Sequence, residues 1–447
     1  MKNKYIYMHV YVYYVYLMKI SSYKIFNDII FSWLVAVLFL ILGCKKDLKT
    51  DEDISPKTGS RTEFTLDSLY LYAKEIYLWN DALPSYSAFS PREKYAHIAS
   101  EINAVNNELF DLSQFKINEK TKLPYEYRGL SNPKYSYIET FYKQKTKATL
   151  SAFAAQNSTI IVNHIDNLTY LYIPSFPQLN TLRNDLDNIF IDIAKHKPST
   201  MVIDLRYNKG GYIETAEYLA NLIASSKLNG KIMYVESFNS TLSEGKGKIL
   251  KHQPYLDING NYVKINGRQA TMADVDFSEK GNTYYFDKKA QLESVENIYF
   301  ITSGSTASAS ELLISLFKPY YNVKLVGQKT FGKPVGFFPI KIDKYSIYLS
   351  SFLLKNAAGW FDYFEGMEPN IAVDLPINPK LGDPKEACLE NIFRDLERNK
   401  ISLSAINRKK YTGVNQYYNK TLNSDKEMPL IEERLKLTLD IKTLNTK

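Results

Sequence analysis

Apolar residues recur every three to four positions in several long segments, which is the spacing of one face of an amphipathic helix. Shorter apolar runs, continuous or alternating with polar residues, lie between these segments and predict β-strands. The predicted helices are in 64–112, 179–193, 214–225 and 308–318, with a last one from Asp383 onward. The predicted strands are 159–163, 168–173, 200–206, 232–235, 298–302, 323–326, 338–342 and 346–354. Strands that alternate with helices predict an α/β core, preceded by a small N-terminal helical domain.

Turn and cap residues sharpen some of these boundaries. Asp166 and Asn167 separate the first two strands as a turn would. Two segments, Ser90-Pro-Arg-Glu93 and Asp383-Pro-Lys-Glu386, each have a capping residue, then proline, and glutamate at the fourth position. This pattern is typical of a capped helix start. The segment from Ser240 to Glu279 is polar and reads as an insertion, and no repeats are evident.

The N-terminus has the pattern of a secretory leader. An apolar run from Ile29 to Gly43 follows Lys19 and Lys24 and is shorter than the roughly 20 residues that a bilayer span needs. It ends in Ile-Leu-Gly-Cys44, which resembles the lipobox of bacterial lipoproteins, so Cys44 is the predicted lipidation site. A plain membrane anchor is the alternative, and the tyrosine-rich start leaves Met18 as a possible true first residue.

These observations divide the chain into five parts. We expect a signal peptide at 1–43, a polar tether at 44–61, the helical domain and its linker at 62–135, the α/β core at 136–398, and a polar tail at 399–447 whose structure the sequence does not predict. The lipid anchor would hold the protein in a bacterial cell envelope, on the outer membrane, with its periplasmic or surface orientation left open.

Composition adds mainly exclusions. The net charge of +8 comes from scattered basic residues without a stripe or long run, so no nucleic-acid partner is predicted. The two cysteines, Cys44 and Cys388, lie in unlike settings, and Cys388 falls inside a predicted helix as a packed thiol. The five histidines lie outside any serine or glycine motif, and no ligand cluster is evident. The sequence therefore predicts no metal and no cofactor, and it does not reveal the oligomeric state.

Candidate chemistry centres on Ser308, at the predicted start of a helix that follows a strand. Free backbone N–H groups at such a position stabilise negative charge, which suits a nucleophile whose attack creates an oxyanion. The same serine, with Glu311 three residues later, also fits a capping box, and local sequence alone favours that structural role. Lys333, between Gly332 and Pro334 and close to phenylalanines, could be a base if burial favoured its neutral form, although a solvated lysine is the simpler interpretation.

Three ordered motifs change this balance. They are Asp204-Leu-Arg-Tyr-Asn-Lys-Gly-Gly211, Thr306-Ala-Ser-Ala-Ser-Glu311 and Thr330-Phe-Gly-Lys333, followed by Gly366-Met-Glu-Pro369. Together they resemble the tail-specific, or carboxy-terminal processing, serine peptidases of family S41, including the 25-residue interval from serine to lysine (333 − 308). The resemblance covers roughly residues 168–374.

The resemblance implies a ClpP/crotonase-like core of stacked β-β-α units and hydrolysis of protein or peptide substrates. It also implies Ser308 as nucleophile, Lys333 as general base, and backbone N–H groups of Ala309 and of Gly210 or Gly211 as oxyanion donors. Two departures concern specificity and support of the lysine. Residues 111–158 are too few for the PDZ domain that usually captures substrate tails, and Phe337 replaces a glutamine that often orients the lysine.

Two other functions are compatible with parts of the sequence. Ser315-Leu-Phe-Lys318 matches the S-x-x-K motif of penicillin-binding proteins, but its K-T-G partner occurs only upstream, as Lys57-Thr-Gly59, in the wrong order. A catalytically silent S41-like lipoprotein that serves as a binding or scaffold module is the stronger alternative. Intact Ser308 and Lys333 favour the peptidase.

Overall fold

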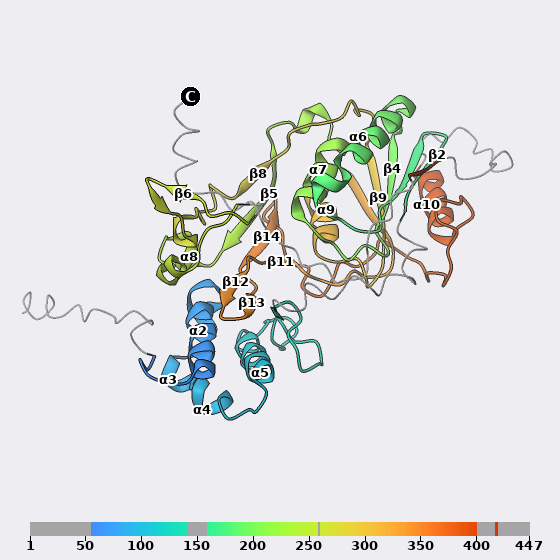
Figure 1. Ribbon diagram of the computed structural model, residues 1–447. Coiled ribbons are helices and arrows are strands. Elements are labelled where there is room, and N and C mark those ends of the chain that lie inside the picture. The colour runs from blue at the N-terminus through green and yellow to red at the C-terminus, as the bar shows by residue number, and fades with distance from the viewer. Residues whose placement is uncertain (1–54, 141–158, 258–259, 400–415, 419–447) are drawn as a thin grey trace, which may run out of the picture. The chain divides into compact units, whose positions relative to one another are not determined.

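The computed structural model describes residues 55–140, 159–257, 260–399 and the backbone of 416–418 (Figure 1). These residues belong to one compact unit, and the preceding unit, residues 1–54, lies outside the described part. The apolar run at 29–43 and Cys44 are therefore not described, nor is most of the predicted tail. Within the described residues, no helix is both long and apolar enough to cross a membrane.

A seven-stranded sheet forms the centre of the α/β core, which confirms the predicted fold class (Figure 1). Neighbouring strands from β3 to β15 run parallel, whereas β2 pairs antiparallel with both β3 and β16. In spatial order the strands are β15 (Ile371–Ala372), β10 (Asn322–Gly327), β9 (Asn297–Thr302), β4 (Thr200–Asp204), β3 (Leu168–Tyr172), β2 (Ile160–Ile165) and β16 (Gln416–Tyr418). Because β3, β4, β9 and β10 are parallel, their carboxyl ends meet at one edge.

Helices cover both faces of this sheet. Alternate side chains of β3 show the division, since Leu171 packs with one apolar cluster and Tyr170 and Tyr172 with the other. The larger cluster includes the apolar faces of α6 (Leu179–His196), α7 (Ile213–Ile223) and α9 (Ala309–Phe317). Helix α10 (Ala387–Arg398) covers the other face with Leu389, Ile392, Phe393 and Leu396, which are buried and contribute about 1.5–3 kcal/mol each.

Smaller sheets pack beside this core. One has the order β11 (Val335–Gly336), β14 (Phe352–Asn356), β5 (Ile232–Phe238) and β8 (Thr283–Tyr285). Another joins β1 (Tyr137–Thr140), β13 (Tyr345–Tyr348) and β12 (Ile340–Ile342), and a short hairpin pairs β6 (Lys264–Ile265) with β7 (Arg268–Gln269). The polar insertion also contains α8 (Ser240–Ser243) and 3-10 turns at Lys248–His252 and Met272–Asp274. A further 3-10 turn, Ser226–Leu228, follows α7.

The N-terminal segment is helical, as the apolar periodicity predicts. It consists of α2 (Arg61–Ile76), a 3-10 turn at Asn80–Ala82, α3 (Tyr86–Phe89), α4 (Pro91–Tyr95) and α5 (Glu101–Ser113). Its apolar side chains belong to the same large cluster as α7 and α9. The helices therefore pack directly against the core.

Three local predictions were wrong. Ser90 is the N-cap residue of α4 and Pro91 begins the helix, as predicted, but the side-chain cap is absent, because Ser90 has a left-handed φ of 48° and its hydroxyl donates to the Ser87 carbonyl. Helix α10 begins after Glu386 rather than Asp383, because the Glu386 carboxylate accepts the Cys388 and Leu389 N–H groups. The predicted strand 346–354 is interrupted, since the Ser350 N–H donates to the Ser136 hydroxyl and leaves the ladder between β13 and β14.

Candidate active site

The candidate site lies at the carboxyl edge of the parallel strands, where the loops after β4 and β9 are bound together. The Ser303 hydroxyl donates to the Arg206 carbonyl, and the Thr306 hydroxyl donates to the Leu205 carbonyl over 2.8 Å. The Ala307 N–H donates to the Asn208 carbonyl over 3.3 Å. These hydrogen bonds bring the glycine turn and the serine loop side by side, although about 100 residues separate them in sequence.

Ser308 stands at the N-cap position of α9 with φ 63° and ψ −121°. A non-glycine residue in such a conformation costs on the order of 1–3 kcal/mol and persists only where its surroundings hold it. Ser308 and Glu311 form the capping box that the local sequence favours, and the Ser308 N–H donates to the Glu311 carboxylate over 3.0 Å. The Ser308 side chain is fully buried, and its hydroxyl makes no hydrogen bond of normal geometry within the part of the chain that the structure describes. A strained strand-to-helix turn with an uncommitted hydroxyl is typical of a nucleophilic serine.

Gly210 makes the close approach to Ser308 possible. Its φ is 97°, and a Cβ added there would lie 2.7 Å from the Ser308 Cβ and 3.0 Å from the Ala309 nitrogen. Gly211 has φ 136°, and a Cβ there would lie 2.0 Å from the Phe176 carbonyl oxygen. A side chain at Gly210 would push the glycine turn away from the serine loop, and one at Gly211 would push it away from the segment around Phe176.

The amides predicted as oxyanion donors differ in their availability. The Gly210 N–H already donates to Oδ1 of Asn208 over 2.9 Å. The N–H groups of Ala309 and Gly211 have no acceptor among the described residues. Ala309 and Gly211 are therefore the better candidate donors, and Asn208 holds the turn that presents them, a role that the motif did not reveal.

Glu311 links the two predicted catalytic positions. Its Oε2 accepts the backbone N–H of Ser308 over 3.0 Å and that of Lys333 over 2.8 Å. Its Oε1 accepts the Gly332 N–H over 2.7 Å and the Thr330 hydroxyl over 2.5 Å. Complete burial raises the pKa of this carboxyl, and the four donated hydrogen bonds work against that rise.

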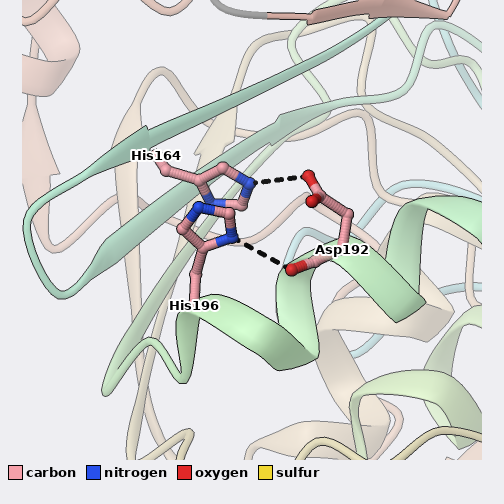
Figure 2. Close-up of side chains that lie close together, drawn as sticks. All are labelled: His164, Asp192 and His196. Atoms are coloured by element: carbon pink, nitrogen blue, oxygen red, sulfur yellow. Dashed lines mark hydrogen bonds and ion pairs between the residues drawn. The ribbon is translucent and has the colours of Figure 1, made fainter.

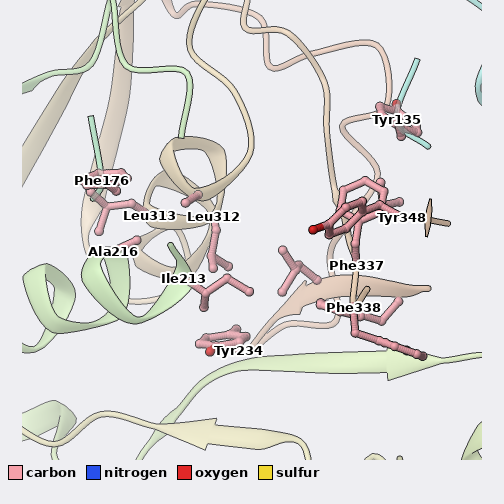
Figure 3. Packing of buried hydrophobic residues seen from close by; sticks show 14 of the residues in the cluster. Tyr135, Phe176, Ile213, Ala216, Tyr234, Leu312, Leu313, Phe337, Phe338 and Tyr348 are labelled. Carbon is pink, nitrogen blue, oxygen red and sulfur yellow. The ribbon is translucent and has the colours of Figure 1, made fainter. Parts of the chain in front are cut away.

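Lys333 is half-buried, and its ammonium lies 4.8 Å from the centroid of the Phe337 ring. The phenylalanine that replaces the expected glutamine thus contacts the lysine through its aromatic face. Phe337 in turn packs against Tyr137, whose ring is stacked on Tyr348. Figure 3 shows Phe337 and Tyr348 among the buried side chains of the large apolar cluster. The Phe337 ring therefore contacts the side chain of Lys333, and the Glu311 carboxylate holds its backbone N–H.

Residues just before β1 close the other side of the lysine loop. The Tyr135 hydroxyl donates to the Gly332 carbonyl over 2.7 Å. The Lys134 ammonium donates to the Phe364 carbonyl over 2.6 Å, and burial lowers the pKa of this second lysine. Neither residue belongs to a recognisable motif, so the sequence offered no signal for them.

Arg206 fixes the base of the site. This fully buried guanidinium contacts both carboxylate oxygens of Asp204 over 2.9–3.0 Å and Oε1 of Glu386 over 2.8 Å. The Tyr170 hydroxyl donates to the same aspartate over 2.6 Å. Asp204 and Arg206 therefore join the end of β4 to the start of α10, which is a structural role behind the site.

The alternative S-x-x-K pair lies elsewhere. Ser315 is buried within α9, and the Lys318 ammonium lies 4.2 Å from the Trp360 ring centroid. Cys388 is buried in α10 as a packed thiol, and burial raises its pKa to about 12.

The structure also brings together three side chains that sequence reasoning treated as ordinary. His164, Asp192 and His196 each offer a ligand atom, and these atoms lie within 4.8 Å of one another. The one available signal was the Asp192-x-x-x-His196 spacing, which places two ligands on one helix face.

The fold and site together define a hydrolase-like α/β domain with a serine at a helix N-terminus. Residues 167–373 match the family model for peptidase family S41, so this part of the chain is similar to the S41 peptidases. The matched segment includes Ser308, Lys333 and both turn glycines. A comparison with curated proteins found no match.

Solved structures with similar folds were also found. A putative S41 protease from Bacteroides fragilis is 20% identical, with a TM-score of 0.40 and coverage of 54% of this chain and 57% of that protein. A photosystem II D1 C-terminal processing protease is 14% identical, with coverage of 72% and 95% and a TM-score of 0.44. A putative peptidase from Parabacteroides merdae is 14% identical, with coverage of 77% and 100% and a TM-score of 0.45.

Proposed function

We propose that the protein is a serine endopeptidase that cleaves envelope proteins or peptides with a Ser308/Lys333 dyad. The observation that supports this best is the shared carboxylate of Glu311, which holds the backbone of both residues on one oxygen atom. The Ser308 hydroxyl and the amides of Ala309 and Gly211, which have no hydrogen-bond partner among the described residues, add to that support.

In the proposed reaction, Nζ of neutral Lys333 takes the Ser308 proton as Oγ attacks the scissile carbonyl. The carbonyl oxygen becomes an oxyanion, which the Ala309 and Gly211 N–H groups stabilise. The C–N bond then breaks, the leaving amine takes the proton from Lys333, and an ester remains on Ser308. Water, deprotonated by Lys333, hydrolyses that ester and restores the enzyme.

The test is hydrolysis of an unfolded reporter protein and of carboxy-terminal peptides by the full chain in detergent. Ser308→Ala and Lys333→Ala should lose activity, whereas Ser305→Ala and Lys329→Ala, which change neighbouring residues of the same types, should keep it. A fluorophosphonate probe should label the wild type and not Ser308→Ala. Equal hydrolysis by the wild type and both dyad variants would refute the assignment.

One observation favours a second candidate, a binding or scaffold module without catalysis. Ser308 has no exposed surface, so a substrate carbonyl reaches it only after a local movement. Peptide binding by the wild type without hydrolysis or probe labelling would support this candidate.

We further propose that Cys44 carries the lipid that anchors the protein in the bacterial envelope. The lipobox-like end of the apolar run supports this. Metabolic labelling with a fatty acid should mark the wild type in the membrane fraction and not Cys44→Ser. Labelling that persists in that variant would refute the proposal.

A further inference from the structure

A cluster of potential metal ligands lies at the amino-terminal ends of the parallel strands, whereas Ser308 lies at their carboxyl-terminal ends. His164 is in β2, shortly before the turn into β3, and Asp192 and His196 are one turn apart near the end of α6 (Figure 2). The parallel strands β3 and β4 begin beside this cluster, at Leu168 and Thr200, and they end beside the candidate active site. The cluster is therefore separate from the peptidase chemistry.

The three side chains converge closely. Nε2 of His164 lies 3.1 Å from Oδ2 of Asp192, and the two imidazole rings are stacked with centroids 3.6 Å apart (Figure 2). The ligand atoms lie within 4.8 Å of one another. Tetrahedral bonds of about 2.1 Å place ligand atoms roughly 3.4 Å apart, and a metal ion lies in the plane of each imidazole ring that binds it. The stacked rings of His164 and His196 must therefore turn toward a common point for the ion to bind.

The second nitrogen of each histidine is already engaged. Nδ1 of His164 lies 2.9 Å from the Thr169 hydroxyl oxygen, and Nδ1 of His196 lies 3.0 Å from the Asp192 carbonyl oxygen. When Nδ1 carries the proton and donates, Nε2 has a free lone pair. Metal-binding histidines in proteins are oriented in this way by a carbonyl or another oxygen acceptor.

The ligand set indicates the class of metal. Two imidazoles and one carboxylate suit Zn²⁺ and similar transition metals, whereas Mg²⁺ and Ca²⁺ prefer oxygen ligands. A water molecule can supply the fourth ligand, because His196 is exposed and His164 and Asp192 keep 14% and 24% of their side-chain surface accessible.

We propose that His164, Asp192 and His196 form a zinc-class site that joins α6 to the β2–β3 hairpin. One ligand comes from the strand and two come from the helix. A bound ion therefore cross-links two elements that the His164–Asp192 hydrogen bond and the stacked His164 and His196 rings already join. Its role is to stabilise the fold, since an ion that binds only the folded state raises the unfolding temperature.

The experiment uses the untagged full chain in detergent, stripped of metal by a chelator and then titrated with ZnCl₂ against a chromophoric competitor. We expect one equivalent of Zn²⁺ to bind and the unfolding temperature to rise with Zn²⁺ concentration. Binding should weaken at least tenfold in His196→Ala and in Asp192→Asn. Both changes are at or near the surface, so the apo fold should persist in both variants. MgCl₂ should produce neither effect.

His97→Ala provides the matched control, because His97 is exposed and lies in the N-terminal helical segment. It should bind Zn²⁺ as the wild type does. Co²⁺ gives a second readout, since a tetrahedral site shows visible d–d absorption that both ligand variants should lose. No stoichiometric Zn²⁺ binding in the wild type, or equal binding in His196→Ala, would overturn the proposal.

Discussion

Glu311→Gln tests the central structural argument, that one carboxylate positions both members of the proposed dyad. Each oxygen of Glu311 accepts two hydrogen bonds. Glutamine replaces one oxygen with an NH₂ group, which then faces two donors whichever way the amide is turned. The substitution preserves the shape of the side chain and removes hydrogen-bond acceptors. Its effect on stability and turnover therefore measures the contribution of the hydrogen bonds to Glu311.

The magnitude follows from the number of bonds lost. Hydrogen bonds to a charged group contribute about 1.5–3 kcal/mol each, so losing two costs on the order of 3–6 kcal/mol. The burial penalty that raises the pKa of Glu311 disappears with the charge and offsets part of that cost. We expect a net loss of roughly 2–4 kcal/mol in the free energy of unfolding. Turnover should fall about a hundredfold, because displacement by about 1 Å is enough for that.

The assays are urea unfolding and peptide hydrolysis, with Glu365→Gln as the control. Glu365 is exposed and lies near Lys134, so the control removes the same charge without removing a buried acceptor. It should retain the stability and turnover of the wild type. If Glu311→Gln unfolds at the wild-type urea concentration with an unchanged kcat, the positioning argument is wrong.

The difference in folding stability between the wild type and Glu311→Gln should change with pH in a definite direction. Burial raises the folded-state pKa of Glu311 above its unfolded value of about 4.3, so folding favours the protonated carboxyl. The associated stability is fully present below the unfolded pKa and is lost as the pH rises through the folded pKa. The stability advantage of the wild type over Glu311→Gln should therefore be larger at pH 4 than at pH 8, and a constant difference would contradict the direction of the shift.

Three further predictions concern the surrounding residues. Gly210→Ala should abolish hydrolysis because its Cβ would lie 2.7 Å from that of Ser308, whereas Gly359→Ala, also at positive φ but with open space around it, should keep activity. Arg206→Leu should lower the free energy of unfolding by about 3–5 kcal/mol, because it leaves the buried Asp204 and Glu386 carboxylates unpaired, and urea unfolding measures this. A pKa of about 12 leaves roughly one part in 10⁴ of the Cys388 thiol ionised at pH 8, so alkylation of Cys388 in the folded Cys44→Ser chain should be slow. The alkylation rate should rise about tenfold per pH unit from pH 8 to pH 10, and a plateau near pH 9 would refute the raised pKa.

The sequence alone was sufficient for the type and order of most elements in the core. Strands β3 and β4 appear in the sequence as continuous apolar runs, and helices α6 and α10 appear as apolar residues three to four positions apart. Both patterns are local, because the residues that a strand or helix buries recur at short intervals along the chain. Ser308, Lys333 and the turn glycines were also identifiable, because their motifs are local and occur in a fixed order. Their catalytic roles stay predictions.

Tertiary structure decided what local patterns could not encode. Glu386, rather than Asp383, caps α10, and Arg206 binds the second oxygen of this capping carboxylate from 180 residues away. The predicted strand from 346 to 354 breaks because Ser350 bonds to Ser136.

The same reason applies to the two sites. Glu311 has the spacing of an ordinary capping residue, and only the return of the 330–333 loop to the start of α9 makes it the link between Ser308 and Lys333. His164 and Asp192 lie 28 residues apart, and a strand and a helix must pack before they meet. Hydrophobic periodicity reports the face that a residue buries, whereas the partner that it finds there depends on how the whole chain closes.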